Sequence, residues 1–228
     1  SLTPPTGDNR DRCGAYMKIV TLIILFLSMN LTFGQELNGK WLMTKEGDTY
    51  SYPTNLIMEF KSDSIIYYDF DKFYNSIQVE IKNDKIIMNS KNVEKFDFIN
   101  KDRLKIFSKV KKEKKDLILI TEYVRLLPTK TTLTKEKIEN LSFNFNWNGE
   151  KFKIIFNQEL GSPEMKKFLK KDQLSKVLLE KLDSTYFVSV YESGKRQRIM
   201  PIKEVTNEQM ILYGTSKKPY EIRSEKSE

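Results

Sequence analysis

Two carboxylates in the first half of the chain, with two more just before them, are the first candidates for chemistry. Asp69 and Asp71 are two positions apart, and Glu59 and Asp63 precede them. Side chains two positions apart on a β-strand point to the same side, so this pair offers the oxygen ligands that Ca²⁺ and Mg²⁺ prefer. The segment lacks the glycine-containing loop typical of calcium sites. We therefore interpret it as a solvated strand end, and we expect no metal site and no cofactor.

A second set of carboxylates, Glu80, Asp97 and Glu122, would act as acid and base in sugar cleavage if two of them faced each other. The sequence does not give the separation between them. The chain has no histidine, which excludes Ser-His-Asp and Cys-His catalysis and any histidine-ligated metal. We therefore expect a protein that is not an enzyme. A carboxylate-dependent glycan hydrolase is the least favoured alternative.

The segment 17–34 has the layout of a secretory signal peptide. Lys18 is followed by the apolar run Ile19–Leu27, and the small residue Gly34 stands just before Gln35. The run is much shorter than the roughly 20 apolar residues that cross a bilayer. Cleavage near Gly34 and Gln35 is therefore expected rather than a retained anchor, and the working protein is predicted to be secreted or periplasmic.

Composition limits the partners of the chain. Its 228 residues carry a net charge of +8, with both signs interspersed. The one dense basic run, 109–115, lacks the interleaved aromatic residues of a nucleic-acid platform, so we expect an exposed hairpin loop, no nucleic acid, and peripheral contact with an anionic surface at most. The single cysteine, Cys13, lies in residues 1–16, a polar stretch interpreted as a non-native or mis-called leader. The exported chain would therefore contain no disulfide.

Residues 35–127 have the pattern of successive strands joined by short polar turns. Ile77, Val79 and Ile81 alternate with polar residues, which puts one row of side chains inside and the other in water. Eight strands are predicted, and an antiparallel meander of this size removes its open edges by closing into a barrel. The expected fold is therefore mainly β, beginning with an eight-stranded antiparallel barrel.

A smaller α+β unit with an antiparallel sheet is expected to follow. Residues 128–140 form a linker with a short helical turn capped by Thr134, and residues 141–216 form the domain itself. The final residues, 217–228, are polar and predicted to fray.

Local signals place the elements of this second unit. Asn148-Gly149 between alternating strands predicts a hairpin, since both turn residues must accept positive φ. Ser162–Lys171 and Asp172–Leu182 are predicted as helices, the first from its capping serine and Pro163. Strands then resume and end with Gln209–Tyr213.

Gly39-Lys40-Trp41, shortly after the leader, resembles the start of lipocalin-like proteins secreted by Bacteroidetes-type bacteria. The resemblance covers about Glu36 to Leu127, and the helix that usually follows such a barrel is not evident. It implies an eight-stranded barrel that binds a ligand or a surface without catalysis. Trp41 would then close one barrel end, with its indole N–H bonded to a carbonyl.

The barrel interior is the predicted ligand site, lined by Trp41, Tyr67, Phe96 and Phe98. Bulky residues can fill a small barrel completely or leave room for one small ligand. The residues expected to fill this one are Met58, Phe60, Tyr67, Phe96, Phe98 and Phe107. We expect a binding protein for a small hydrophobic ligand. The alternative is an envelope-associated module with a filled barrel, which interacts with another envelope protein or has a structural role.

Overall fold

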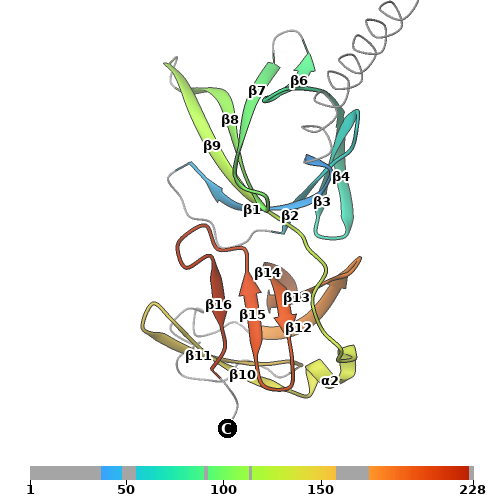
Figure 1. The fold of residues 1–228 in the computed structure, drawn as a ribbon, viewed down its shortest axis with the longest axis vertical. Helices are drawn as coiled ribbons and strands as arrows, with labels where there is room; N and C mark the ends of the chain where they lie inside the picture. Colours follow the sequence, from blue (N-terminus) through green and yellow to red (C-terminus); the bar gives the residue numbers. More distant parts are fainter. Residues whose placement is uncertain (1–36, 48–54, 90–91, 113–114, 158–174, 226–228) are drawn as a thin grey trace, which may run out of the picture.

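A computed structural model describes residues 37–47, 55–89, 92–112, 115–157 and 175–225. This part of the chain consists mainly of antiparallel strands, arranged as two units stacked along the long axis (Figure 1). The mainly β class is therefore confirmed. The predicted signal peptide and the predicted helix Ser162–Lys171 lie outside the described residues.

The first unit is one nine-stranded sheet that curls into a nearly closed barrel (Figure 1). Its strand order is β4-β3-β2-β1-β9-β8-β7-β6-β5, and all neighbours are antiparallel. The strands are β1 (Gly39–Glu46), β2 (Leu56–Phe60), β3 (Ser64–Asp69), β4 (Lys72–Gln78), β5 (Glu80–Lys82), β6 (Lys85–Asn89), β7 (Asn92–Asn100), β8 (Arg103–Lys112) and β9 (Lys115–Arg125).

The strand count is nine, not the predicted eight, because one run of the chain changes its pairing partner at Val79. Before Val79, β4 pairs with β3; after it, β5 pairs with β6. The Val79 amide donates to the carbonyl of Asp63 at 2.8 Å. Because β4 and β5 are the two ends of the sheet, the single residue between them brings these ends together.

The second unit combines a five-stranded sheet, a two-stranded hairpin and a short helix. The sheet order is β12-β13-β14-β15-β16, and the hairpin is β10-β11. The elements are α2 (Lys135–Glu139), β10 (Ser142–Trp147), β11 (Glu150–Ile155), β12 (Ser175–Leu182), β13 (Thr185–Glu192), β14 (Lys195–Val205), β15 (Met210–Tyr213) and β16 (Glu221–Arg223).

The hairpin connects with both outer strands of this sheet. The Glu225 amide, just after β16, donates to the Asn144 carbonyl in β10 at 2.7 Å. The Asn157 amide, just after β11, donates to the Val177 carbonyl in β12 at 2.9 Å. Seven strands thus surround one apolar core, which includes Phe143 and Phe145. The described part of this unit is mostly strand, so the α+β expectation is not confirmed there.

Three predictions for the second unit can be compared with these elements. The Thr134 cap is confirmed, since its hydroxyl accepts the Lys137 amide at 3.3 Å at the start of α2. The helix over Asp172–Leu182 is wrong over its described part, which is strand β12. The prediction that the tail after residue 216 frays is wrong over its described part, since β16 pairs with β15 and the side chain of Ile222 is buried.

A further apolar core joins the two units. It combines outward-facing residues of the barrel with one face of the second sheet, and all of its central members are buried. They are Leu42, Ile57, Phe70 and Val124 from the barrel and Phe187, Ile199 and Tyr213 from the second unit. The barrel wall at β2, β1 and β9 is therefore covered on its outside by the second sheet.

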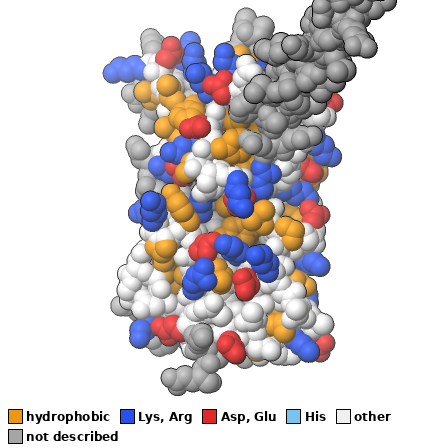
Figure 2. Space-filling view, viewed as in Figure 1, with side chains coloured by type: hydrophobic (Ala, Val, Ile, Leu, Met, Phe, Trp, Pro, Cys, Tyr) orange, Lys and Arg blue, Asp and Glu red, His pale blue; other side chains and the backbone are white. Residues whose placement is uncertain are grey.

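On the face drawn in Figure 2, cationic and anionic side chains are interspersed with apolar ones. Within the described residues, no helix is both long and apolar enough to span a membrane.

Candidate functional site

The barrel interior gathers the inward-facing side chains of the first sheet into one apolar cluster. Side chains alternate between the two faces of each strand. On β1, Trp41 and Met43 point inward, whereas Leu42 points to the second unit. The buried members are Leu37, Trp41, Met43, Met58, Phe60, Ile65, Val79, Ile86, Phe96, Leu104, Ile106 and Tyr123. Tyr67 and Phe98 are half-buried and pack against them. All four predicted ligand-site residues thus belong to this cluster.

Trp41 closes one end of this cluster. Its side chain is 0% exposed, and its indole Nε1 donates to the Leu37 carbonyl at 2.8 Å. The guanidinium carbon of Arg125 lies 4.2 Å from the centre of the indole ring. Arg125 also donates to the Asn38 carbonyl at 2.7 Å. The predicted bond from the indole N–H to a carbonyl is thus observed, and the arginine that covers the ring was not predicted.

Two further aromatic rings continue from Trp41 into the interior. Phe98 lies 6.2 Å from Trp41 between ring centres, and Phe96 lies 5.8 Å from Phe98 in an edge-to-face arrangement. Such contacts add to the stability that burial gives. This end of the barrel is therefore filled by side chains.

The interior becomes polar away from Trp41. Glu94 precedes Phe96 by two positions, so it points to the same face, and its strand partner Ile86 is buried in the interior cluster. It lies four positions from Phe98, or about 13 Å along the strand. The Glu94 side chain is half-buried and makes no hydrogen bond or salt bridge with any described residue.

Two phenols lie near this carboxylate. Burial, followed by the negative charge of Glu94, raises the pKa of Tyr67. Burial also raises the pKa of Tyr123, with smaller contributions from Tyr67, Glu94 and Glu46. Both phenols therefore stay protonated and can donate hydrogen bonds to a ligand. We define Tyr67, Glu94 and Tyr123 as the polar interior site.

The sequence interpretation missed two residues of this site. Glu94 is in phase with Phe96 and Phe98, which is a signal that a carboxylate faces the interior. Tyr123 lies one position before Val124, and only the register of β9 shows which of the two faces inward. Phe107 was expected inside, but its neighbour Ile106 is the interior residue, so Phe107 faces outward and is half-buried.

Two of the candidate cation ligands, Asp69 and Asp71, lie on either side of a turn residue instead. Asp69 and Asp71 are exposed, and the buried Phe70 between them adopts a φ of +60°. The Phe70 ring lies 5.2 Å from that of Phe187, edge to face, and the guanidinium of Arg196 lies 4.1 Å from it. The described residues contain no group of three or more acidic, cysteine or histidine side chains able to hold a metal ion.

Two of the other carboxylates, Glu122 and Glu80, form ion pairs with lysines. Glu122 lies 3.8 Å from Lys105 and 4.0 Å from Lys45. Lys105 is the strand partner of both Glu122 and Asp97, so one strand separates the two acids by about 10 Å. Glu80 is exposed and pairs with Lys82 at 2.8 Å. A lysine thus lies between Glu122 and Asp97 where a hydrolytic pair would need room for a substrate.

No protein-family model matches the chain, and a search of curated proteins finds no relative. Function must therefore be argued from the geometry of the barrel.

Proposed function

We propose that this protein is a non-catalytic binding protein that holds a small hydrophobic ligand in the barrel interior. The observation that carries the proposal is the change in character of that interior. It is aromatic and closed at Trp41, and half-buried and polar at Tyr67 and Glu94. Ligand sites commonly combine an apolar lining with a few placed polar groups.

The resemblance of Gly39-Lys40-Trp41 to secreted lipocalin-like proteins supports the same function. On this proposal the protein acts outside the cytoplasm after cleavage near Gly34 and Gln35. The mass of the natural mature protein tests this part, and a chain that retains the apolar run Ile19–Leu27 would contradict it.

Titration of the full chain with Nile red, an uncharged apolar dye, tests ligand binding. We expect saturable binding at one site per chain. Phe98→Ala should weaken it about tenfold, since losing a ring contact removes about 1.4 kcal/mol. Phe152→Ala is the matched control, because Phe152 is also half-buried but lies in the second unit. Absence of saturable binding, or equal effects of the two variants, would contradict the proposal.

An envelope-associated interaction or structural module is the second candidate. The burial of Met58, Phe60, Ile65 and Leu104 favours it, because these side chains fill interior space that a ligand would otherwise occupy. A chain that takes up no dye, yet is recovered cross-linked to an envelope protein, would support this candidate over the first. Recovery as a freely diffusing monomer with no captured partner would count against it.

A further inference from the structure

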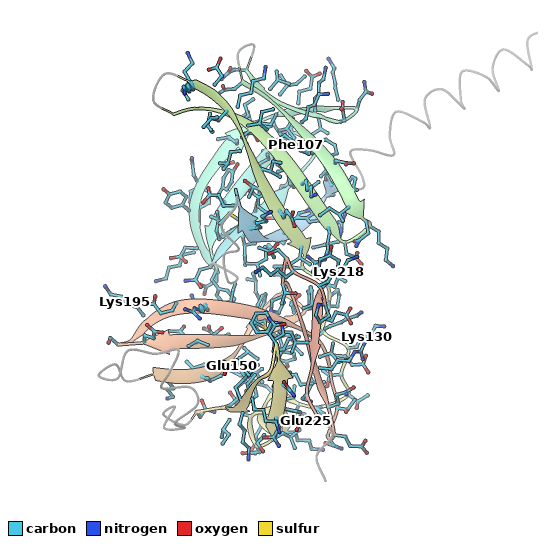
Figure 3. The ribbon with its side chains drawn as sticks, turned by 90° about the vertical axis from the view of Figure 1, so that its left-hand side faces the viewer. Phe107, Lys130, Glu150, Lys195, Lys218 and Glu225 are labelled. Atoms are coloured by element: carbon cyan, nitrogen blue, oxygen red, sulfur yellow. The ribbon has the colours of Figure 1, made fainter. Side chains whose placement is uncertain are left out.

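The hairpin formed by β8 and β9 continues past the points where its two strands pair with the neighbouring strands of the barrel. β7 pairs with β8 only as far as Phe107, and β1 pairs with β9 only as far as Thr121. Beyond these points the two strands pair with each other, through Lys112 and Lys115. Figure 3 shows this hairpin, beyond Phe107, at the end of the molecule opposite to Glu225.

Two adjacent aliphatic residues near the end of this hairpin face solvent. Leu117 is 46% exposed and Ile118 is 65% exposed. Because neighbouring strand residues point to opposite faces, both faces of the hairpin present an aliphatic side chain. Single exposed apolar residues are common, but these two are consecutive and lie where β8 and β9 pair only with each other.

Exposed lysines surround this pair. Lys109 is the strand partner of Ile118, and Lys111 and Lys115 lie nearby on the same hairpin. None of the three ammonium groups forms a salt bridge with a residue in the described ranges. Asp116 is the one described acid among them, so the local charge is positive. We call Lys109, Lys111, Lys115, Leu117 and Ile118 the hairpin surface.

We propose that the hairpin surface docks on an anionic phospholipid bilayer. Aliphatic side chains enter the boundary between headgroups and acyl chains, and lysines keep their ammonium groups at the phosphates while their stems lie along apolar surface. Positive charge near an anionic leaflet adds to this attraction. Single-stranded nucleic acid is disfavoured as the occupant, because neither exposed apolar residue is aromatic and stacking needs aromatic rings. The proposal does not depend on a ligand in the barrel.

Co-sedimentation with lipid vesicles tests this proposal. The full chain is mixed with vesicles of phosphatidylcholine alone or of phosphatidylcholine with phosphatidylglycerol. We expect preferential binding to the anionic vesicles, weakening as salt is raised. The triple change of Lys109, Lys111 and Lys115 to Gln should weaken binding about 100-fold, at roughly fivefold per lysine. The double change L117S/I118S should weaken binding at least tenfold.

Matched controls separate the hairpin surface from general charge and general hydrophobicity. Changing Lys151, Lys153 and Lys176 to Gln alters net charge equally, but on the second unit. F73S/Y74S removes two side chains that are 67% and 74% exposed on β4. Both controls should leave binding within twofold of the original chain. The run Ile19–Leu27 is the same in every variant, so its own affinity for lipid cancels in the comparison.

Three results would overturn the proposal. The first is equal binding to neutral and anionic vesicles. The second is equal loss in the hairpin variants and their controls while circular dichroism shows all of them folded. The third is binding to soluble polyglutamate without binding to anionic vesicles, which would identify an acidic polypeptide as the partner.

Discussion

Trp41 is a fully buried aromatic residue at one end of the barrel interior. Its ring is fully buried, its N–H is bonded to the Leu37 carbonyl, and Arg125 covers one ring face. Trp41→Ala leaves a large cavity and should lower the free energy of unfolding by about 3–5 kcal/mol. Denaturant unfolding followed by circular dichroism measures this loss. Trp147→Ala is the control, because Trp147 is only half-buried and should lose less. Equal losses would contradict the role given to Trp41.

Glu180 and Arg196 form the best-defined ion pair in the described part of the second unit. Two nitrogens of Arg196 donate to the Glu180 carboxylate at 2.6 and 2.8 Å, and the Tyr191 hydroxyl donates at 3.0 Å. Burial alone would raise the pKa of Glu180, but these interactions outweigh it and hold that pKa below its usual value. The ionised carboxylate therefore stabilises the fold.

The lowered pKa gives a pH dependence with a definite sign. The stabilisation is complete above the unfolded-state pKa, roughly 4.3, and is lost as the pH falls through the lower folded-state pKa. Glu180→Gln should therefore make the free energy of unfolding fall less steeply in acid, and should lower it at pH 7 by about 1.5–3 kcal/mol. Unfolding measured from pH 7 to pH 3 checks both effects. Glu80→Gln, in an exposed pair, should change neither. An unchanged acid slope in the Glu180 variant would refute this assignment.

At the scale of elements, two glycines with left-handed backbones allow the cost of backbone strain to be measured separately from the cost of tight packing. Gly149 has a φ of +81° and open space where a Cβ would lie. Gly214 has a φ of +103°, and a Cβ there would lie 3.2 Å from Pro201 and 3.7 Å from Val124. Alanine at either position should lower the free energy of unfolding by about 1–2 kcal/mol, because a residue with a Cβ is strained in the left-handed conformation. Gly214→Ala should lower the free energy of unfolding by about 1–3 kcal/mol more, because the added methyl group overpacks the contact with Pro201. Equal changes in thermal unfolding would show that Gly214 is not in a tight contact.

The sequence predicts most strands of the barrel, because their turns carry strong local signals. Asn83 and Asn148 adopt the positive φ expected of turn residues in hairpins. The basic run 109–115 does lie in a hairpin, between β8 and β9, but residues 109–112 and 115 belong to its strands rather than to the predicted loop. The split at Val79 could not be predicted, because an unbroken alternation does not show that the chain changes its partner strand.

Strand β12 fits the pattern of a helix because leucines lie on both of its faces. Val177 and Leu179 face the core of the second unit, whereas Leu182 packs in the core shared with the barrel. Apolar residues on both faces of a strand obscure the alternation that identifies a half-buried strand. Leu174, Val177, Leu178 and Leu182 therefore match a helical period equally well.

The candidate site was predicted in part. The four aromatic residues follow from their size and from alternation, and they do meet inside the barrel. The polar interior site depends on the three-dimensional neighbourhood of Glu94, which brings together residues from β3, β7 and β9. Sequence spacing alone carries no information about such a contact.

At the scale of the whole molecule, the shared core between the units predicts cooperative unfolding. Its central side chains, including Phe70 and Phe187, are buried, so separating the units would expose apolar surface on both. Further contacts cross the interface, among them an ion pair of Lys40 with Asp183 at 2.5 Å and a hydrogen bond from Ser216 to the Thr44 carbonyl at 3.0 Å.

The chain should therefore unfold in one transition. In Trp147→Phe, Trp41 is the sole tryptophan, so its fluorescence reports the barrel, whereas circular dichroism reports both units. The two signals should change at the same denaturant concentration. Phe187→Ala should lower that midpoint for both signals together. Two separate transitions would show that the units fold independently and that the shared core adds little stability.

The central claim is that the barrel holds a ligand, and native mass spectrometry of the protein purified gently from its natural source tests it most directly. The account predicts a reproducible extra mass that denaturation releases, and a decrease in its occupancy in Phe98→Ala but not in Phe152→Ala. A chain that always appears at its bare mass, with no uptake of added apolar compounds, would contradict the claim and favour a filled barrel that acts through its surface.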